Sequence, residues 1–190
     1  YSYYGVWHDS FSEFYDSMLT GINFSPPLYF LFNFFLQLIF QTSIEQLRIQ
    51  SLAFIIIGII LSFLLTRKIF GTTIAFFSTI LVASQSNLLL AQAQEARHYA
   101  MFFACGAWVL YMQSFDNKTV KRYNWLTFIA HFCLCQVHYF GIIFSFLSGF
   151  AYFLTSRNTG LWKRVLVSIT ICWLVSIVSY LFYLTKQKSV

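Results

Sequence analysis

The sequence predicts an all-α protein in which a polytopic bundle of helices is embedded in a membrane. The first observation behind this prediction is composition, because 58% of the 190 residues are hydrophobic and only 9% are charged, whereas about a quarter of the residues in soluble domains are charged. The second is pattern, since apolar blocks alternate with short polar segments and several blocks are long enough to cross a bilayer. The third is that basic residues gather at every second junction between blocks, as they do in cytoplasmic loops.

The apolar blocks differ in length, and length decides which of them can span. In order they are Leu28 to Phe40, Ile49 to Thr66, Thr73 to Leu90, Tyr99 to Met112, Trp125 to Val137, Tyr139 to Thr155 and Val165 to Leu184. A perpendicular span needs about 17 to 25 residues, so the second, third, sixth and seventh blocks are long enough. The fourth and fifth reach this length by including their polar flanks. The sequence therefore predicts about six spans.

The first block is short, follows Pro26-Pro27 and contains Asn33 and Gln37, so its placement is a choice between two arrangements. If it crossed the membrane, the acidic amino-terminal segment would face the cytoplasm. If it lies in the interface as a juxtamembrane helix, that segment stays outside. The second arrangement is preferred: residues 1–47 form an outer loop with juxtamembrane helices, residues 48–190 contain the spans, and 92–98 and 137–139 also lie on the outer face. The basic groups that mark the inner loops are Arg67-Lys68, Lys118 with Lys121-Arg122, and Arg157 with Lys163-Arg164.

Domain organisation and partners follow from the same composition. No repeat, low-complexity tract or linker interrupts residues 1–190, which are interpreted as one membrane-embedded domain. The chain begins at Tyr1 without an initiator methionine, so we expect it to be part of a longer protein. The net charge is +6, but the basic residues are scattered and form no patch for nucleic acid. The four cysteines lie in apolar runs, where a free thiol behaves as a small hydrophobe, and no metal site is predicted from them.

The amino-terminal segment contains the first candidate for chemistry, Asp9, within Trp7-His8-Asp9-Ser10. A carboxylate there could accept a proton from a hydroxyl nucleophile in the transition state. The alternative is a solvated loop aspartate. Asp9 with His8 and Glu13 could in principle hold a divalent cation, but the spacing matches no motif, so neither a metal nor another cofactor is predicted.

Two further polar groups lie at predicted membrane boundaries. Arg48 precedes the second block and either snorkels to the interface or binds a phosphate with its two-pronged guanidinium group. Glu95 and Arg97 belong to the polar run Gln92 to Tyr99. They form either an interfacial pair or the wall of a wet cavity that recognises sugar or phosphate, since a charge at mid-bilayer costs about 2.5 to 3.5 kcal/mol.

Histidines mark the last two candidate positions. His138-Tyr139-Phe140-Gly141 is predicted to form a tight outer turn, and its rings either make an interfacial aromatic belt or contact a substrate. His131 falls in the middle of a span, where we expect a hydrogen bond between helices in preference to a ligand.

The chain resembles the membrane glycosyltransferases of the C-type fold, in particular the family 39/83-like group related to protein O-mannosyltransferases and aminoarabinose transferases. Five pieces occur in the order of that group. They are Trp7-His8-Asp9-Ser10 for Trp-x-Asp-Glu, Ser25-Pro26-Pro27-Leu28-Tyr29-Phe30 for His-Pro-Pro-Leu-Tyr-Tyr, Leu47-Arg48 for the Leu-Arg of Leu-Arg-x-Pro-Ser, Gln94-Glu95-Ala96-Arg97-His98-Tyr99-Ala100 for Gln-Glu-Ala-Arg-Pro-Tyr-Ala, and Val137-His138-Tyr139-Phe140-Gly141 for Thr-His-Tyr-Phe-Gly. Ser10 replaces the Glu of the group, and Ser25 replaces its His.

The resemblance implies an inverting transferase that moves a sugar from a polyprenyl-phosphate donor to an acceptor hydroxyl at the outer membrane face. Asp9 would be the catalytic base, and Arg48 and Arg97 would bind the donor phosphate. One carboxylate suffices because a sugar phosphate leaves as a stabilised anion and needs no acid. The substrate-binding positions it implies are His8, Glu95, Tyr99, His138 and Tyr139. The alternative is a lipid-binding or lipid-moving protein of the same fold, which would need Arg48 and an apolar groove but no base.

Overall fold

The regular structure of the chain is helical. The computed structural model describes residues 10–13, 16, 26–40, 44–85, 98–115, 121–156 and 162–187, and no strand occurs in these ranges. The main elements are α2 (Pro27–Phe40), α3 (Ile44–Phe70), α4 (Thr72–Ser84), α6 (Tyr99–Gln113), α7 (Lys121–Val137), α8 (Phe140–Ser156) and α9 (Trp162–Gln187). The predicted all-α class is therefore confirmed for the described part of the chain.

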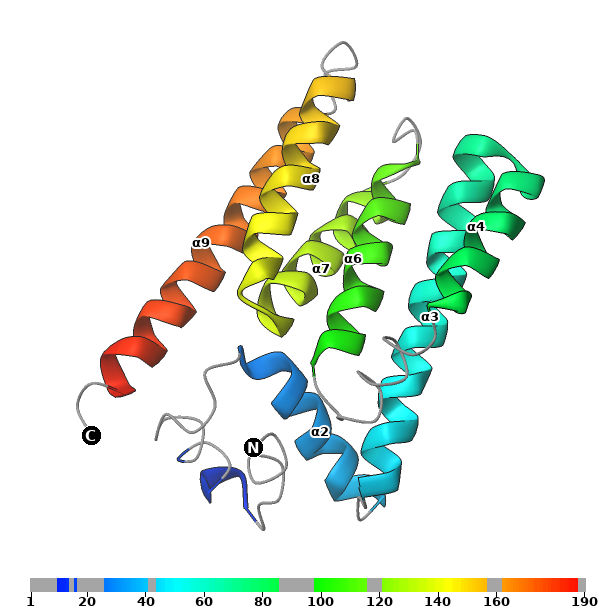
Figure 1. Cartoon of the computed structure of the whole chain (residues 1–190). Helices are drawn as coiled ribbons and strands as arrows, with labels where there is room; N and C mark the ends of the chain where they lie inside the picture. Colours follow the sequence, from blue (N-terminus) through cyan, green and yellow to red (C-terminus); the bar gives the residue numbers. More distant parts are fainter. Residues whose placement is uncertain are drawn as a thin grey trace.

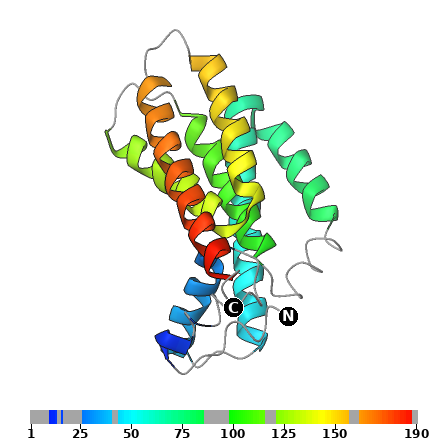
Figure 2. The same ribbon diagram turned by 90° about the vertical axis from the view of Figure 1, so that its left-hand side faces the viewer.

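The helices form a bundle in which neighbours in sequence are mostly neighbours in space (Figure 1). The α7, α8 and α9 helices pack on one another, and α6 joins them through α7 and α8. The α3 helix packs along α6, and α4 folds back against α3 at the edge of the bundle. The α2 helix is the exception, because it lies across one end of the bundle and contacts α7 there (Figures 1 and 2).

Several helix boundaries differ from the apolar blocks, among them the start of α3 and the end of α4. The α3 helix begins at Ile44, not at Ile49, so Arg48 lies within the helix and not before it. Polarity does not prevent this extension, because Glu, Gln and Arg are good helix formers and Glu45 in the first turn complements the helix dipole. The α4 helix ends at Ser84, and residues 86–90, which the apolar block also included, lie outside the described ranges.

The two ends of the bundle differ in chemistry. At one end, the last turn of α3 contains Arg67 and Lys68, α7 begins at Lys121, and α9 begins at Trp162 (Figure 1). The ammonium group of Lys68 lies 3.4 Å from the ring centre of Phe115, which follows α6. We call this the basic end. The opposite end carries α2, the start of α6 and the turn between α7 and α8, and we call it the α2 end.

Among the described residues, one helix, Glu45–Phe70, is long and apolar enough to cross a membrane by length and composition. The other apolar helices are shorter: Pro27–Phe40, Thr72–Ser84, Trp125–Val137, Phe140–Thr155 and Ile169–Leu181. Large apolar side chains cover their outer surfaces, and Phe77 and Leu81 of α4, for example, are 66% and 67% exposed. The number of spans stays a prediction.

The core of the bundle extends to the α2 end. Tyr29, Phe30 and Phe34 of α2 are buried against a cluster that includes Leu134 and Val137 of α7. The buried residues of α2 fall on one face because they pair at a spacing of four, Tyr29 with Asn33 and Phe30 with Phe34, and residues four apart on a helix share a side. This packing fixes α2 across the helix ends and so positions the candidate site.

Candidate functional site

A cluster of aromatic rings lies at the α2 end, where α2, α6 and the α7–α8 turn meet. The ring centres of His98 and His138 are 4.8 Å apart, and Tyr99 lies 4.5 Å from His98 and 5.5 Å from His138. Tyr29 of α2 meets His98 edge to face at 6.1 Å. We call these four residues the ring cluster. Tyr29 and His98 are buried, so Tyr99 and His138 are the rings of the cluster that remain accessible.

His138 is held by the turn that it starts. Its Nδ1 accepts a hydrogen bond from the Phe140 N–H at 3.0 Å, and its carbonyl accepts one from the Gly141 N–H at 2.7 Å. Because Nδ1 is an acceptor, the neutral ring carries its proton on Nε2. Partial burial lowers the pKa of His138 below its usual range, which favours this neutral form. The predicted tight turn is confirmed, and His138 caps α8 in addition to joining the ring cluster.

Gly141 is required where it stands. A Cβ at this position would overlap the carbonyl oxygen of Leu134, because the first turn of α8 passes directly against the last turn of α7. Cys135 donates a weak S–H hydrogen bond to the Gly141 carbonyl, with 3.8 Å between sulfur and oxygen. This close approach is the local reason why His138 lies under the start of α6.

The two tyrosines predicted to bind substrate point to different neighbours. Tyr99 is 38% exposed and belongs to the ring cluster. Tyr139 is 41% exposed, but its ring packs on Tyr180 of α9, with ring centres 4.9 Å apart. The structure therefore brings Tyr99 and His138 together and directs Tyr139 toward another helix.

A buried polar group lies next to the ring cluster, between α2 and α3. Asn33 is 0% exposed and Ser51 is 1% exposed, and both flank the phenol of Tyr29. Burial raises the pKa of Tyr29, and the Asn33 and Ser51 side chains partly offset the rise. The phenol of Tyr29 therefore links Asn33 of α2 to Ser51 of α3. We call Tyr29, Asn33 and Ser51 the polar seam.

An apolar groove runs between α3, α6 and α7. Its volume is about 330 Å³, and it is lined by Phe54, Ile57, Leu61, Met101, Ala104, Cys105, Trp108 and Cys133. Met101 and Cys105 also belong to the core cluster beneath α2, and Phe54 meets Phe32 of α2 with ring centres 5.6 Å apart. The groove therefore borders the α2 end, and it could hold a hydrocarbon chain but no polar head group.

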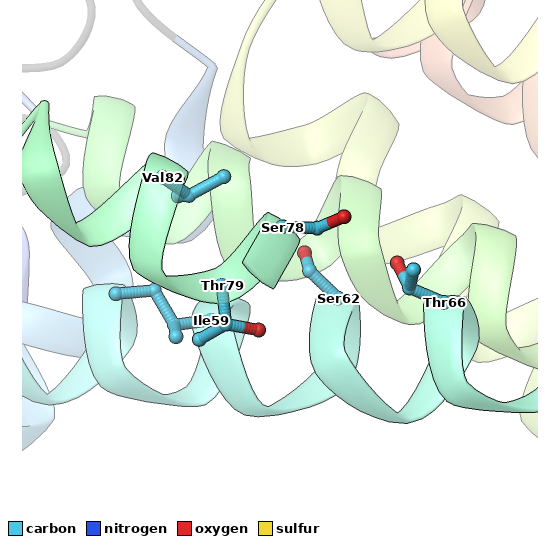
Figure 3. A pocket seen from close by; sticks show the side chains of 6 residues that line it. All are labelled: Ile59, Ser62, Thr66, Ser78, Thr79 and Val82. Carbon is cyan, nitrogen blue, oxygen red and sulfur yellow. The ribbon is translucent and has the colours of Figure 1, made fainter. Parts of the chain in front are cut away.

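Two other hollows are more distant from the ring cluster. One of about 300 Å³ lies between α8 and α9 and has an aromatic lining that includes Phe146, Phe150 and Trp173. The other, shown in Figure 3, has a volume of about 40 Å³ and lies between α3 and α4. The hydroxyls of Ser62, Thr66, Ser78 and Thr79 line it together with Ile59 and Val82. That volume suits an ordered water, which needs about 10–15 Å³ of accessible space.

His131 lies within the bundle, and its environment confirms the predicted role. Its Nε2 is 3.0 Å from the Gln113 amide nitrogen of α6, and its Nδ1 is 2.6 Å from the Ser145 hydroxyl of α8. Trp173 of α9 also donates to Ser145, at 2.9 Å. His131 therefore joins α7 to two neighbouring helices by hydrogen bonds and has both ring nitrogens occupied.

Several predicted site residues lie outside the described ranges, namely His8, Asp9, Glu95 and Arg97. Whether Asp9 meets the two arginines is therefore still a prediction. Arg48 is described, and it lies exposed on the second turn of α3 beside the buried Leu47. Within the described ranges, no group of three or more His, Cys, Asp or Glu side chains could hold a metal ion, and Cys105, Cys133, Cys135 and Cys172 are free thiols.

Sequence reasoning did not assign the residues that connect α2 to this site. Tyr29 and His98 were noticed only within longer motifs, and Ser51 was not singled out. One signal could have found the polar seam, because Tyr29, Asn33 and Gln37 recur every four residues in a mostly apolar helix. Residues with that spacing share a helix face.

Comparison of the chain with protein-family models, with curated proteins and with solved structures found no match.

Proposed function

We propose that this chain is a multi-pass integral membrane protein with a C-type glycosyltransferase-like bundle, and that it transfers a sugar from a polyprenyl-phosphate donor to an acceptor hydroxyl. The observation that carries the proposal is the open apolar groove bordering the α2 end, where Tyr99 and His138 converge. The lipid tail of the donor would occupy the groove, and its sugar would lie near the ring cluster.

The outer surface supports a membrane location. Exposed large apolar residues cover α3, α4, α8 and α9 over areas that soluble monomers rarely expose. The basic end and the α2 end lie on opposite sides of this apolar band (Figure 1). Under the positive-inside rule, the basic end faces the cytoplasm and the α2 end lies on the outer face.

The proposed reaction needs one base and one cationic partner. Asp9 removes the proton of the acceptor hydroxyl as its oxygen bonds to the anomeric carbon. The bond from that carbon to the phosphate oxygen breaks, the anomeric centre inverts, and the polyprenyl phosphate leaves with both electrons. Arg48 and Arg97 stabilise the phosphate anion, which needs no proton to depart.

Substitution of Asp9 tests the proposal. Asp9→Asn keeps the shape of the side chain but removes the base, so we expect sugar transfer from a polyprenyl-phosphate sugar to fall by more than tenfold. Asp16→Asn in the same segment is the matched control and should retain activity. Asp9→Asn activity within tenfold of the unmodified protein would exclude Asp9 as the base.

Measurements of lipid binding distinguish a transferase from a lipid-binding or lipid-moving protein of the same fold. Ala104 is a buried small residue in the groove lining, so Ala104→Phe should fill the groove and weaken binding of radiolabelled polyprenyl phosphate in either case. Asp9→Asn should leave that binding unchanged. Lipid binding with no sugar transfer by the unmodified full-length protein would favour the second function.

A further inference from the structure

We propose that the hollow between α8 and α9 binds an anionic phospholipid, with a hydrocarbon chain of the lipid in the hollow and its phosphate head group held by Lys163 and Arg164 of α9. The site lies between two helices that contribute no residue to the proposed reaction. It rests on the membrane location proposed above, but not on sugar transfer.

The side chains around the hollow offer only carbon to an occupant. They are Phe146, Phe150, Phe153, Leu166 and Trp173. The indole nitrogen of Trp173 is the one polar atom among them, and its N–H donates to the Ser145 hydroxyl at 2.9 Å. Because Ser145 is fully buried, that N–H is used inside the bundle. A polar or charged group in the hollow would lose its hydration and gain no partner from these side chains, so the occupant is hydrocarbon.

The hollow is elongated along the two helices. Phe146 and Phe153 of α8 are seven residues apart, as are Leu166 and Trp173 of α9, and seven residues rise about 10 Å along a helix. A volume of about 300 Å³ over that length gives a mean cross-section of about 30 Å², far below the roughly 80 Å² of a helix about 10 Å in diameter. The hollow therefore has room for a single extended chain and not for a partner helix.

The hollow is accessible from the side of the bundle. Phe146 and Phe150 are 52% and 51% exposed, and their nearly parallel rings have centres 6.4 Å apart. The Phe146 ring also lies 5.3 Å from Trp173 of the neighbouring helix. A chain in the surrounding bilayer can therefore enter between α8 and α9, which lie side by side (Figures 1 and 2).

Basic residues lie at one end of the hollow and select the head group. Lys163 and Arg164 belong to the first turn of α9, at the basic end, three and two residues before Leu166. Positions three apart on a helix lie on the same side, so Lys163 falls on the side of α9 that contains Leu166. Under the positive-inside rule this end faces the cytoplasmic leaflet, which contains anionic lipids. Charge complementarity therefore favours an anionic phospholipid over a neutral lipid.

Fluorescence quenching tests the site in the full chain reconstituted in phosphatidylcholine nanodiscs. A variant with Trp7, Trp108, Trp125 and Trp162 changed to Phe keeps Trp173 as its only tryptophan. Bromine atoms on a lipid chain quench an indole that they contact. Brominated phosphatidylglycerol should quench Trp173 half-maximally at a mole fraction about tenfold lower than brominated phosphatidylcholine, since each basic residue near an anionic lipid surface strengthens binding about fivefold.

Two pairs of charge substitutions test the head-group site. Lys163→Gln with Arg164→Gln should abolish the preference for phosphatidylglycerol. Arg67→Gln with Lys68→Gln is the matched control, because it removes two positive charges from the same end of the bundle but from α3, and it should keep the preference. Loss of the preference in both pairs would assign it to general surface charge and overturn the site.

The remaining outcomes separate this site from the other proposals. Equal quenching of Trp173 by both lipids would overturn the site alone, whereas quenching by neither would overturn it together with the membrane location. Sugar transfer does not enter the measurement, so the Asp9→Asn assay can fail while this test succeeds. If the variant with a single tryptophan does not fold, native mass spectrometry of the unmodified chain replaces it. That chain should retain phosphatidylglycerol about tenfold more than the Lys163→Gln, Arg164→Gln variant, and equal retention would overturn the site.

Discussion

At the scale of single residues, His131 is fully buried, and its two ring nitrogens are hydrogen-bonded to side chains of two other helices. His131→Ala would leave Gln113 and Ser145 unpaired and open a cavity, so we expect unfolding free energy to fall by about 2–4 kcal/mol. Thermal or denaturant unfolding in detergent measures this loss. Thr127→Val is the control, since the Thr127 hydroxyl has no hydrogen bond within the described ranges, and it should cost little. Equal losses in the two variants would contradict the role of His131.

His138 predicts how stability depends on pH. Its folded-state pKa is lowered by burial, so its contribution to stability is present above the unfolded-state pKa, which is about 6.5, and is lost as pH falls through and below that value. Protonation of Nδ1 also removes the acceptor for the Phe140 N–H. The unfolding midpoint should therefore fall between pH 7.5 and pH 5. His138→Asn keeps an acceptor at the helix start and should flatten this pH dependence; an unchanged profile would count against His138 as its source.

At the scale of elements, the α7–α8 turn depends on Gly141. A methyl group there would overlap the Leu134 carbonyl, and backbone atoms cannot move aside cheaply. Gly141→Ala should therefore lower unfolding free energy by about 2 kcal/mol or more and disturb the ring cluster. The control is Gly106→Ala in α6, where an added Cβ would meet only ordinary contacts at 3.7 Å and beyond. Because alanine favours helix, Gly106→Ala should be neutral or stabilising, and similar losses in both variants would refute the steric argument.

The sequence allowed most helices to be predicted, because apolar blocks end where the chain must turn. Gly71, which has a φ of 89° between α3 and α4, and the His138–Gly141 turn both mark such ends. The start of α3 was not predictable in this way, since residues 44–48 are mostly polar. They are helical because Leu47 is buried in the core cluster that also contains α2 residues, a contact that no local pattern encodes.

The candidate site was predictable only in part, for a related reason. The sequence predicts Tyr99 and His138 as site residues, and their rings do lie close together. His98, which contacts both rings, lies at the end of a polar run that is typical of a loop. The polar seam depends on which face of α2 meets α3. The spacing of Tyr29 and Asn33 places them on one side of α2, but it does not say that this side meets α3, so the burial of Asn33 required the tertiary structure.

At the scale of the whole molecule, the apolar outer surface makes a prediction about insertion. Phe77 lies near the middle of α4 and is 66% exposed, so on the proposed membrane location Phe77→Lys should cost about 3 kcal/mol of insertion free energy. The fraction of protein that resists extraction from membranes at alkaline pH should fall. Ile69→Lys, 57% exposed at the basic end, is the matched control and should be tolerated. Equal tolerance of both substitutions would contradict a bilayer around α4.

The position of α2 has a consequence for biosynthesis. The core partners of α2 on α7, such as Leu134 and Val137, are translated roughly a hundred residues after α2 itself. At a translation rate of about 5–20 residues per second, those partners are synthesised about 5–20 s after α2. Its aromatic face must be shielded during that interval, so assembly of this end of the protein is a late event that follows pairing of the neighbouring α3 and α4 helices.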